Sequence, residues 1–268
     1  MLNIIRIGSL FLLVLLSACT TTSSSFTTPY ATKETTSTGS SYDLEKAAAT
    51  RLTLGLRYLS QGDFEKAKFN LDKALAHYPK SEEVQRGVAW YYEKVNEDKL
   101  AEEHYKKALS INNKNPSLLN QYGVFLCRKG KLNESLEMFQ ASISIPSNKD
   151  VSGTYENAAT CNIMAGNQEA AESNYRKALN HNPEQRDSLF GMARIEYGKG
   201  RYERTRAYLS RFEEVAKHNS RSLWLAIRNE SKLRNLDAAA SYAIKLEQLF
   251  PDSKETELFL DTKNQWLR

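Results

Sequence analysis

The side chains that could carry out chemistry in this 268-residue sequence are few, and they form no recognised catalytic motif. There is no Gly-rich phosphate loop, no His-Glu-x-x-His, no Cys-x-x-Cys and no nucleophilic Ser between glycines. Two of the four histidines, His77 and His181, stand just before a proline, where a cation favours the negative end of a helix. Acidic pairs such as Glu102-Glu103 are typical of solvated helix faces. We therefore expect neither an enzyme, nor a metal site, nor a bound cofactor.

One side chain does have a predicted modification. Cys19 follows a short apolar run, residues 10–16, and the small residues Ser17 and Ala18, with the single charge of Arg6 before the run. The run is well short of the roughly 20 apolar residues of a membrane span and is typical of a secretory signal. A cysteine directly after Leu-Ser-Ala resembles the bacterial lipobox, in which the thiol receives a lipid and the chain is cut before it. An ordinary secretory signal with a chance cysteine is the alternative.

The segment after this cysteine is predicted to be a tether. It is mostly Thr and Ser, so it cannot bury enough apolar surface to fold, and it could reach roughly 70 Å when stretched. We expect a signal peptide over residues 1–18, the lipidated Cys19 with its tether over 19–41, and a folded domain over 42–268. Lipoproteins without Asp after the lipidated cysteine usually go to the outer membrane, and a Thr stands there. The resemblance therefore implies a covalent lipid anchor in the outer membrane, with the domain facing the periplasm.

The composition favours a helical protein and argues against a nucleic-acid partner. Glycine and proline are scarce, at 12 and 6, while Ala, Leu, Glu and Lys abound. The chain has 37 basic and 32 acidic residues and a net charge of +5, which is too small an excess to indicate nucleic-acid binding. Charges of both signs alternate along the chain, as they do on solvated helix faces.

An internal repeat of 34 residues organises the predicted domain. Small residues recur at this spacing, with a single step of 36, at Ala67, Ala101, Ser135, Ala171, Thr205 and Ala239. A larger residue follows four positions later at Leu71, Tyr105, Phe139, Tyr175 and Leu209. Small residues are needed where helix backbones approach closely, and the larger ones fill the space between them. This regular spacing is the signature of a repeat architecture.

This period and pattern resemble the tetratricopeptide repeat, which implies that each unit is a pair of antiparallel helices. Six units fit, at about 48–81, 82–115, 116–149, 152–185, 186–219 and 220–253, with a capping helix at 254–268. The predicted fold class is all-α, a superhelix of six helix-turn-helix repeats, because one unit cannot bury its apolar face alone. An irregular helical bundle is the alternative.

The two remaining cysteines are candidates for a disulfide. Cys127 and Cys161 lie near the ends of the first helices of repeats three and four, and those helices are side by side in such a stack. An oxidising compartment permits a bond between them. It would close a loop of about 35 residues and stabilise the fold by roughly 3–4 kcal/mol on the chain-entropy model. Two buried free thiols are the alternative.

The resemblance to tetratricopeptide repeats also implies that the first helix of each unit lines a concave groove. In the first two units the inward-facing residues are expected to be Leu52, Leu56, Leu59, Arg86, Trp90 and Lys94. A second, more basic stretch in the last two units comprises Phe190, Arg194, Tyr197, Trp224 and Arg228. Exposed Leu and Trp side chains without a core role mark an interaction surface. Packing between repeats is the alternative for some of them, notably Leu56 and Phe190.

Local sequence narrows the family. The stretches that carry the resemblance are RLTLGLRYLSQGD at 51–63 with EKAK at 65–68, LNQYGVFL at 119–126, and RSLWLAIR at 221–228 with AASYAIKL at 239–246 and LFPDS at 249–253. They are similar to the first, third and sixth repeats of the type IV pilus biogenesis and stability lipoproteins, the PilW/PilF family. The resemblance implies a pilotin, an adaptor that binds the pilus secretin subunit, helps it reach the outer membrane and promotes its assembly into a multimeric channel. It also implies a role in twitching motility.

Other functions remain open to a repeat lipoprotein of this kind. It could scaffold enzymes that remodel peptidoglycan, or assist outer-membrane protein assembly. A hydrolase would require a site assembled across repeats from residues that have no local signature. No small-molecule substrate and no nucleic acid is expected as a partner.

Overall fold

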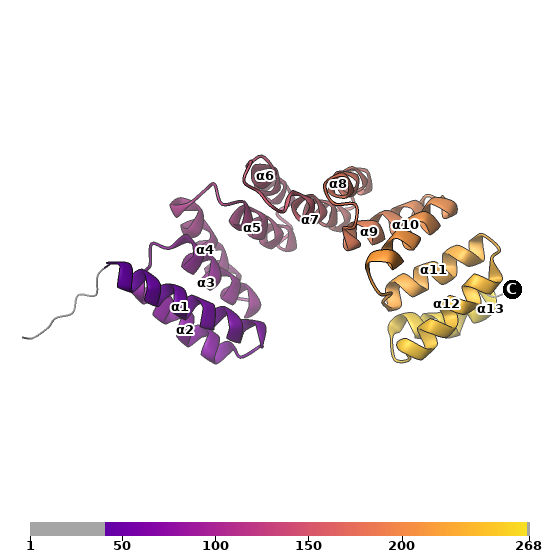
Figure 1. Cartoon of the computed structure of the whole chain (residues 1–268), viewed down its shortest axis with the longest axis horizontal. Helices are drawn as coiled ribbons and strands as arrows, with labels where there is room; N and C mark the ends of the chain where they lie inside the picture. The colour runs from indigo at the N-terminus through magenta and orange to yellow at the C-terminus, as the bar shows by residue number, and fades with distance from the viewer. Residues whose placement is uncertain (1–40, 267–268) are drawn as a thin grey trace, which may run out of the picture. The chain divides into compact units, whose positions relative to one another are not determined.

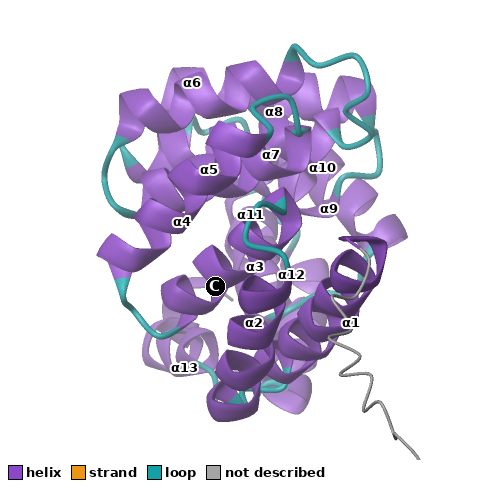
Figure 2. Ribbon diagram, turned by 90° about the vertical axis from the view of Figure 1, so that its left-hand side faces the viewer, coloured by secondary structure: helices purple, strands orange, loops and turns teal. Residues whose placement is uncertain are grey.

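The computed structural model describes residues 41–266, and these residues form thirteen α-helices and no strand (Figures 1 and 2). In chain order the helices are α1 (Ser41–Ser60), α2 (Phe64–His77), α3 (Glu82–Lys94), α4 (Asp98–Ile111), α5 (Pro116–Arg128), α6 (Leu132–Ile143), α7 (Val151–Met164), α8 (Gln168–His181), α9 (Arg186–Gly198), α10 (Tyr202–Val215), α11 (Ser220–Lys232), α12 (Leu236–Leu249) and α13 (Lys254–Trp266). The expected signal peptide, Cys19 and most of the tether lie outside the described residues. Within them, no helix is long and apolar enough to cross a membrane.

The helices follow the predicted repeat. Each odd-numbered helix from α1 to α11 packs against the helix that follows it, and the resulting hairpins stack in chain order (Figure 1). The first helices of neighbouring hairpins also touch, as α1 does with α3 and α9 with α11. This arrangement confirms the all-α tetratricopeptide fold class.

Short polar side chains fix where many of the helices begin. A side-chain oxygen of the residue before the helix accepts a hydrogen bond from a backbone N–H of the first turn, which would otherwise lack a partner. The residues that do this are Asp63, Ser81, Asn115, Asp150, Asn219 and Asn235. The starts of these six helices are therefore marked by local hydrogen bonds.

The turn inside each hairpin requires one residue with a left-handed backbone. The residues at this position have φ between 58° and 80° and are Gly62, Asn96, Gly130, Gly166, Gly200 and Arg234. Glycine adopts this conformation without a steric penalty, and asparagine tolerates it, but a long side chain is uncommon there. The sixth repeat therefore closes its hairpin with a strained arginine.

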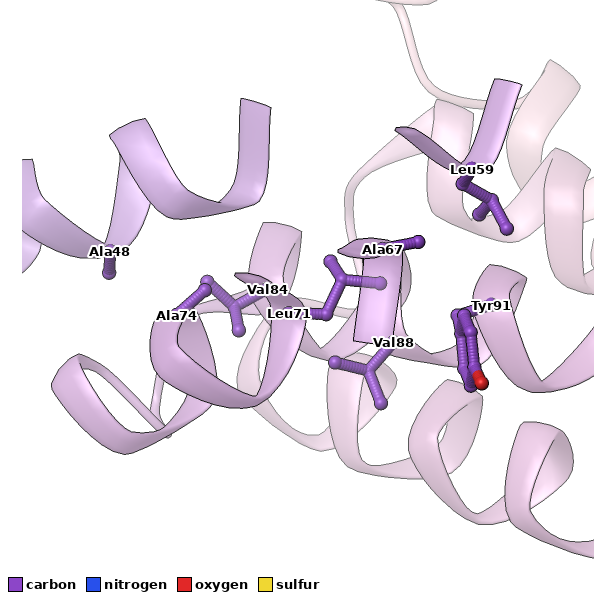
Figure 3. Packing of buried hydrophobic residues seen from close by; sticks show 8 residues of the cluster. All are labelled: Ala48, Leu59, Ala67, Leu71, Ala74, Val84, Val88 and Tyr91. Atoms are coloured by element: carbon purple, nitrogen blue, oxygen red, sulfur yellow. The ribbon is translucent and has the colours of Figure 1, made fainter. Parts of the chain in front are cut away.

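The core consists of the two columns of small and large residues. The small residues from Ala67 to Ala239 are fully buried, and Leu71, Tyr105 and Phe139 lie beside them with almost no exposure. Close approach is strict at Gly191, where an added Cβ would lie 2.5 Å from the ring of Tyr175. Figure 3 shows the first cluster, to which α1, α2 and α3 all contribute. At the other end, α13 packs against α11 and α12 and buries Phe259.

Candidate partner-binding groove

The first helices of the early repeats line a shallow groove. One depression of about 130 Å³ lies between α1 and α3 and is lined by Leu52, Leu56, Glu83, Arg86, Gly87, Trp90 and Gln121. A second, of about 330 Å³, is lined by Trp90, Glu93, Tyr105, Asn120, Gln121, Val124, Arg128 and Asn157. Because Trp90 and Gln121 line both, the two depressions form one continuous surface, which we call the N-terminal groove. It runs from α1 to α7.

Four of the predicted residues lie together in this groove. Leu52, Leu56, Arg86 and Trp90 all line the depression between α1 and α3, and all are partly exposed. Leu52 also packs closely against the second repeat. A Cβ added at Gly87 would lie only 2.5 Å from Leu52 Cδ1. Both leucines pack against the first core cluster. They therefore combine a packing role with an exposed apolar surface.

One predicted groove residue requires correction. Leu59 is only 4% exposed and belongs to the first core cluster, so a partner cannot reach it (Figure 3). Its position one turn beyond Leu56 places it among the core residues of α1, α2 and α3. Lys94 is exposed beside the groove, and its Nζ lies 5.8 Å from the centre of the Trp90 ring. Its place at the groove stays a prediction.

The cations of the N-terminal groove are neutralised. Arg86 Nε donates to Glu82 Oε1 at 2.9 Å, and its Nη1 donates to Gln121 Oε1 at 3.3 Å. Arg128 forms an ion pair with Glu93 of the preceding repeat. The hydroxyl of Tyr105 donates to the other oxygen of Glu93 at 3.1 Å. The groove thus offers apolar surface from leucine, tryptophan and valine beside charges that already have partners.

Sequence reasoning missed part of this wall. Val124 stands at the position of Leu56 and Trp90 in the third repeat, 34 residues after Trp90, so the repeat spacing could have found it. The pairing of Arg128 with Glu93 could not be found in this way, because it depends on side-chain distances between neighbouring repeats.

The second predicted stretch forms a cationic and aromatic surface, which we call the C-terminal surface. The guanidinium carbon of Arg228 lies 5.0 Å from the ring centre of Tyr197 and 5.1 Å from that of Trp224, within cation–π range. Burial lowers the pKa of the Arg228 guanidinium, and the nearby charge of Arg194 lowers it further, against an opposing contribution from Tyr197. Phe190 is partly buried against two core clusters, which favours a packing role for it.

A disulfide joins the two halves of the repeat array. Cys127 at the end of α5 and Cys161 in α7 are bonded, with their Cα atoms 5.8 Å apart. The bond therefore links repeats three and four, near the C-terminal ends of α5 and α7. Within residues 41–266, no cluster of histidine, cysteine and carboxylate side chains could hold a metal ion.

Known proteins with similar sequences contain the same type of repeat. The tetratricopeptide-repeat family model matches residues 52–116 and 165–219. The type IV pilus assembly protein PilF of Pseudomonas aeruginosa is 31% identical over 215 residues, which cover 80% of this chain and 85% of that protein. The chain belongs to the PilF/PilW family. An uncharacterized protein of Haemophilus influenzae is 32% identical over 126 residues, 47% of this chain and 70% of that protein.

Solved structures of the PilF/PilW family have the same fold. The structure of Pseudomonas aeruginosa PilF has a TM-score of 0.73 at 30% identity and covers 82% of this chain and 99% of its own. PilW, described as a widely conserved type IV pilus biogenesis factor, has a TM-score of 0.71 at 25% identity, covering 80% and 98%. Members of this family are tetratricopeptide scaffolds, non-enzymatic adaptors that work by binding other proteins.

Proposed function

We propose that this protein is an outer-membrane lipoprotein adaptor, a pilotin, that binds the type IV pilus secretin subunit and promotes its localisation and multimer assembly. One observation carries the proposal. A chain related to type IV pilus assembly proteins exposes Leu56, Trp90 and Val124 at equivalent positions of three successive repeats, along one continuous groove. The secretin segment lies in this groove, and the mechanism includes no bond-making step.

The groove suits an elongated partner segment. Its apolar residues come from α1, α3 and α5, so a bound helix or extended strand can place an apolar side chain against each repeat in turn. Large apolar anchors of this kind dominate binding energy when they fill a depression, while surrounding contacts mainly exclude water. Trp90 is the central anchor, because it lines both depressions.

Anchoring and binding are separate tasks in this proposal. The lipid on Cys19 holds the adaptor at the outer membrane, since each buried methylene contributes about 0.8 kcal/mol and several acyl chains give stable attachment. Cell fractionation of a Cys19→Ala variant tests this part. We expect the variant to leave the outer-membrane fraction, and its continued presence there would show that the anchor is elsewhere.

The binding proposal is tested by secretin pull-down with matched variants. A Trp90→Glu substitution should weaken secretin binding by about 2 kcal/mol or more, which is about 30-fold, because it removes the central anchor. Lys73→Glu on α2, an exposed residue outside the groove, is the control and should bind normally. In cells, the Trp90 variant should have fewer secretin multimers and reduced twitching. If it melts normally and still binds secretin at full strength, the N-terminal groove is not the secretin site.

A further inference from the structure

The C-terminal surface contains two arginines that have no counter-charge. Arg194 on α9 and Arg228 on α11 occupy equivalent positions of successive repeats. The positive charge of Arg194 contributes to lowering the pKa of Arg228. Among the described residues no carboxylate lies within 4.0 Å of either guanidinium, by contrast with arginines that do have such a contact. Those include Arg86, Arg128, Arg176, Arg201 and Arg206. The fold thus places two cations at equivalent positions of neighbouring first helices, and neither has a carboxylate partner among the described residues.

Arg228 is also partly removed from water. Its side chain is only partly exposed, between the rings of Tyr197 and Trp224, and its Nε is buried without a hydrogen-bond partner. A buried donor without a partner is unfavourable, and a buried charge more so. The two aromatic faces offset part of this cost. The side chain as a whole remains partly exposed, so an acceptor from outside the chain can approach it although Nε itself is covered.

The chemistry of that acceptor follows from the donors. A guanidinium presents a planar set of N–H groups that matches a carboxylate, and two neighbouring guanidiniums favour a ligand with more than one negative charge. The adjacent rings of Tyr197 and Trp224 offer an apolar face next to the charges. We propose that the C-terminal surface binds an acidic segment of a protein partner, with carboxylates on Arg194 and Arg228 and an apolar side chain against Trp224. This proposal concerns a different surface from the secretin groove and does not depend on it.

Other anionic macromolecules fit the surface less well. Nucleic acid requires a stripe of several cations that follows a phosphate backbone, whereas this surface offers one pair in a chain of net charge +5. A flat bilayer is also a poor fit, because first helices line the concave side of stacked tetratricopeptide repeats. A flexible acidic peptide can enter a concave surface and meet both arginines.

The experiment compares two labelled peptides on the full-length chain in detergent. One alternates Glu with Phe, and the other carries Gln in place of every Glu. We expect the Glu peptide to bind at least 10-fold more tightly than the Gln peptide, and salt to reduce the difference. Arg194→Gln and Arg228→Gln should each remove most of this preference. Arg204→Gln on α10, an exposed arginine outside this surface, should keep it.

The readouts distinguish binding from folding. Arg194 is exposed, so its substitution should leave the domain folded. Arg228→Gln loses two cation–π contacts as well as an unpaired buried donor, so its melting temperature is measured beside its affinity. Equal affinity for the two peptides, or full affinity in both arginine variants, would overturn the proposal. So would competition by single-stranded DNA as strong as that by the unlabelled Glu peptide. None of these results would bear on secretin binding at Trp90.

Discussion

The first helices present two different surfaces from one and the same position of the repeat. In repeats one to three the position is occupied by Leu56, Trp90 and Val124, which line the N-terminal groove. In repeats five and six it is occupied by Arg194 and Arg228, which have no carboxylate partner among the described residues. The backbone is equivalent at all five, so the difference lies in the side chains alone.

This contrast shows how a repeat fold separates stability from recognition. The small residues of the buried column, Ala67 to Ala239, have no exposure in either half, because helix hairpins can stack only if their backbones approach closely. The concave position has no such requirement. It can therefore be apolar at one end and cationic at the other without altering the stack.

The largest expected effect concerns the bond between the halves. Replacing Cys127 and Cys161 together by Ser should lower the free energy of unfolding by about 3 kcal/mol, because the cross-link restricts the unfolded chain. Denaturant unfolding monitored by circular dichroism measures this, with reduced wild type as the control. Helix content should hardly change. Mass spectrometry of the unreduced protein that finds two free thiols would contradict the account.

A similar loss of stability is expected at Leu59, which belongs to the first core cluster and not to the groove. Leu59→Ala should destabilise the protein by about 2–5 kcal/mol, because it leaves a cavity in the first core cluster. Leu56→Ala, one turn earlier, should cost less, since that side chain is already partly exposed. Thermal melts of both variants test the distinction. Equal destabilisation would mean that Leu56 belongs to the core and not to the groove.

The hairpin turns allow a comparison at equivalent positions in the two halves. Arg234 has φ of 58° and Asn96 has φ of 61°. Arg234→Gly should stabilise the protein by about 1 kcal/mol, because glycine adopts this conformation without strain. Asn96→Gly should change stability less, since asparagine tolerates it. Chemical denaturation of the pair measures the difference, and a destabilised Arg234→Gly variant would show that the arginine side chain contributes more than the strain removes.

The smallest expected effect is a loss of stability at acidic pH, because each half of the repeat array contains one histidine with a buried side chain. Burial lowers the pKa of His104, whose Nδ1 lies 2.7 Å from Gln85 Oε1, and that of His218, near Glu213. The unfolded chain then binds more protons than the folded one, so stability is retained above the ordinary histidine pKa of 6.5 and is lost as the pH falls below it.

The two histidines should differ in how much stability they lose. A protonated His218 can pair with Glu213, which offsets part of its loss, whereas Gln85 gives His104 no negative charge. Melts between pH 7 and 5 should therefore become less pH-dependent in His104→Gln than in His218→Gln. The reverse order would contradict this assignment.

The sequence predicted the fold and part of the binding surface. The buried columns repeat at a constant spacing, so the hairpins and the exposed positions of Leu56, Trp90 and Arg228 followed from it. Leu59 could not be placed correctly, because Leu52, Leu56 and Leu59 share one helical face, and the packing of α2 and α3 decides which part of that face is covered. The pairing of charged side chains between repeats could not be predicted from the sequence either. Whether Arg128 or Arg228 has a carboxylate partner depends on distances between repeats that no spacing contains.

Photo-crosslinking in cells tests the central claim, secretin binding in the N-terminal groove, most directly. A photoreactive amino acid is placed at position 90 in one strain and at position 73, on α2, in the other. The account predicts a secretin adduct from position 90 and none from position 73. An adduct from position 73 with none from position 90 would contradict it, and would place the secretin on the opposite side of the repeats.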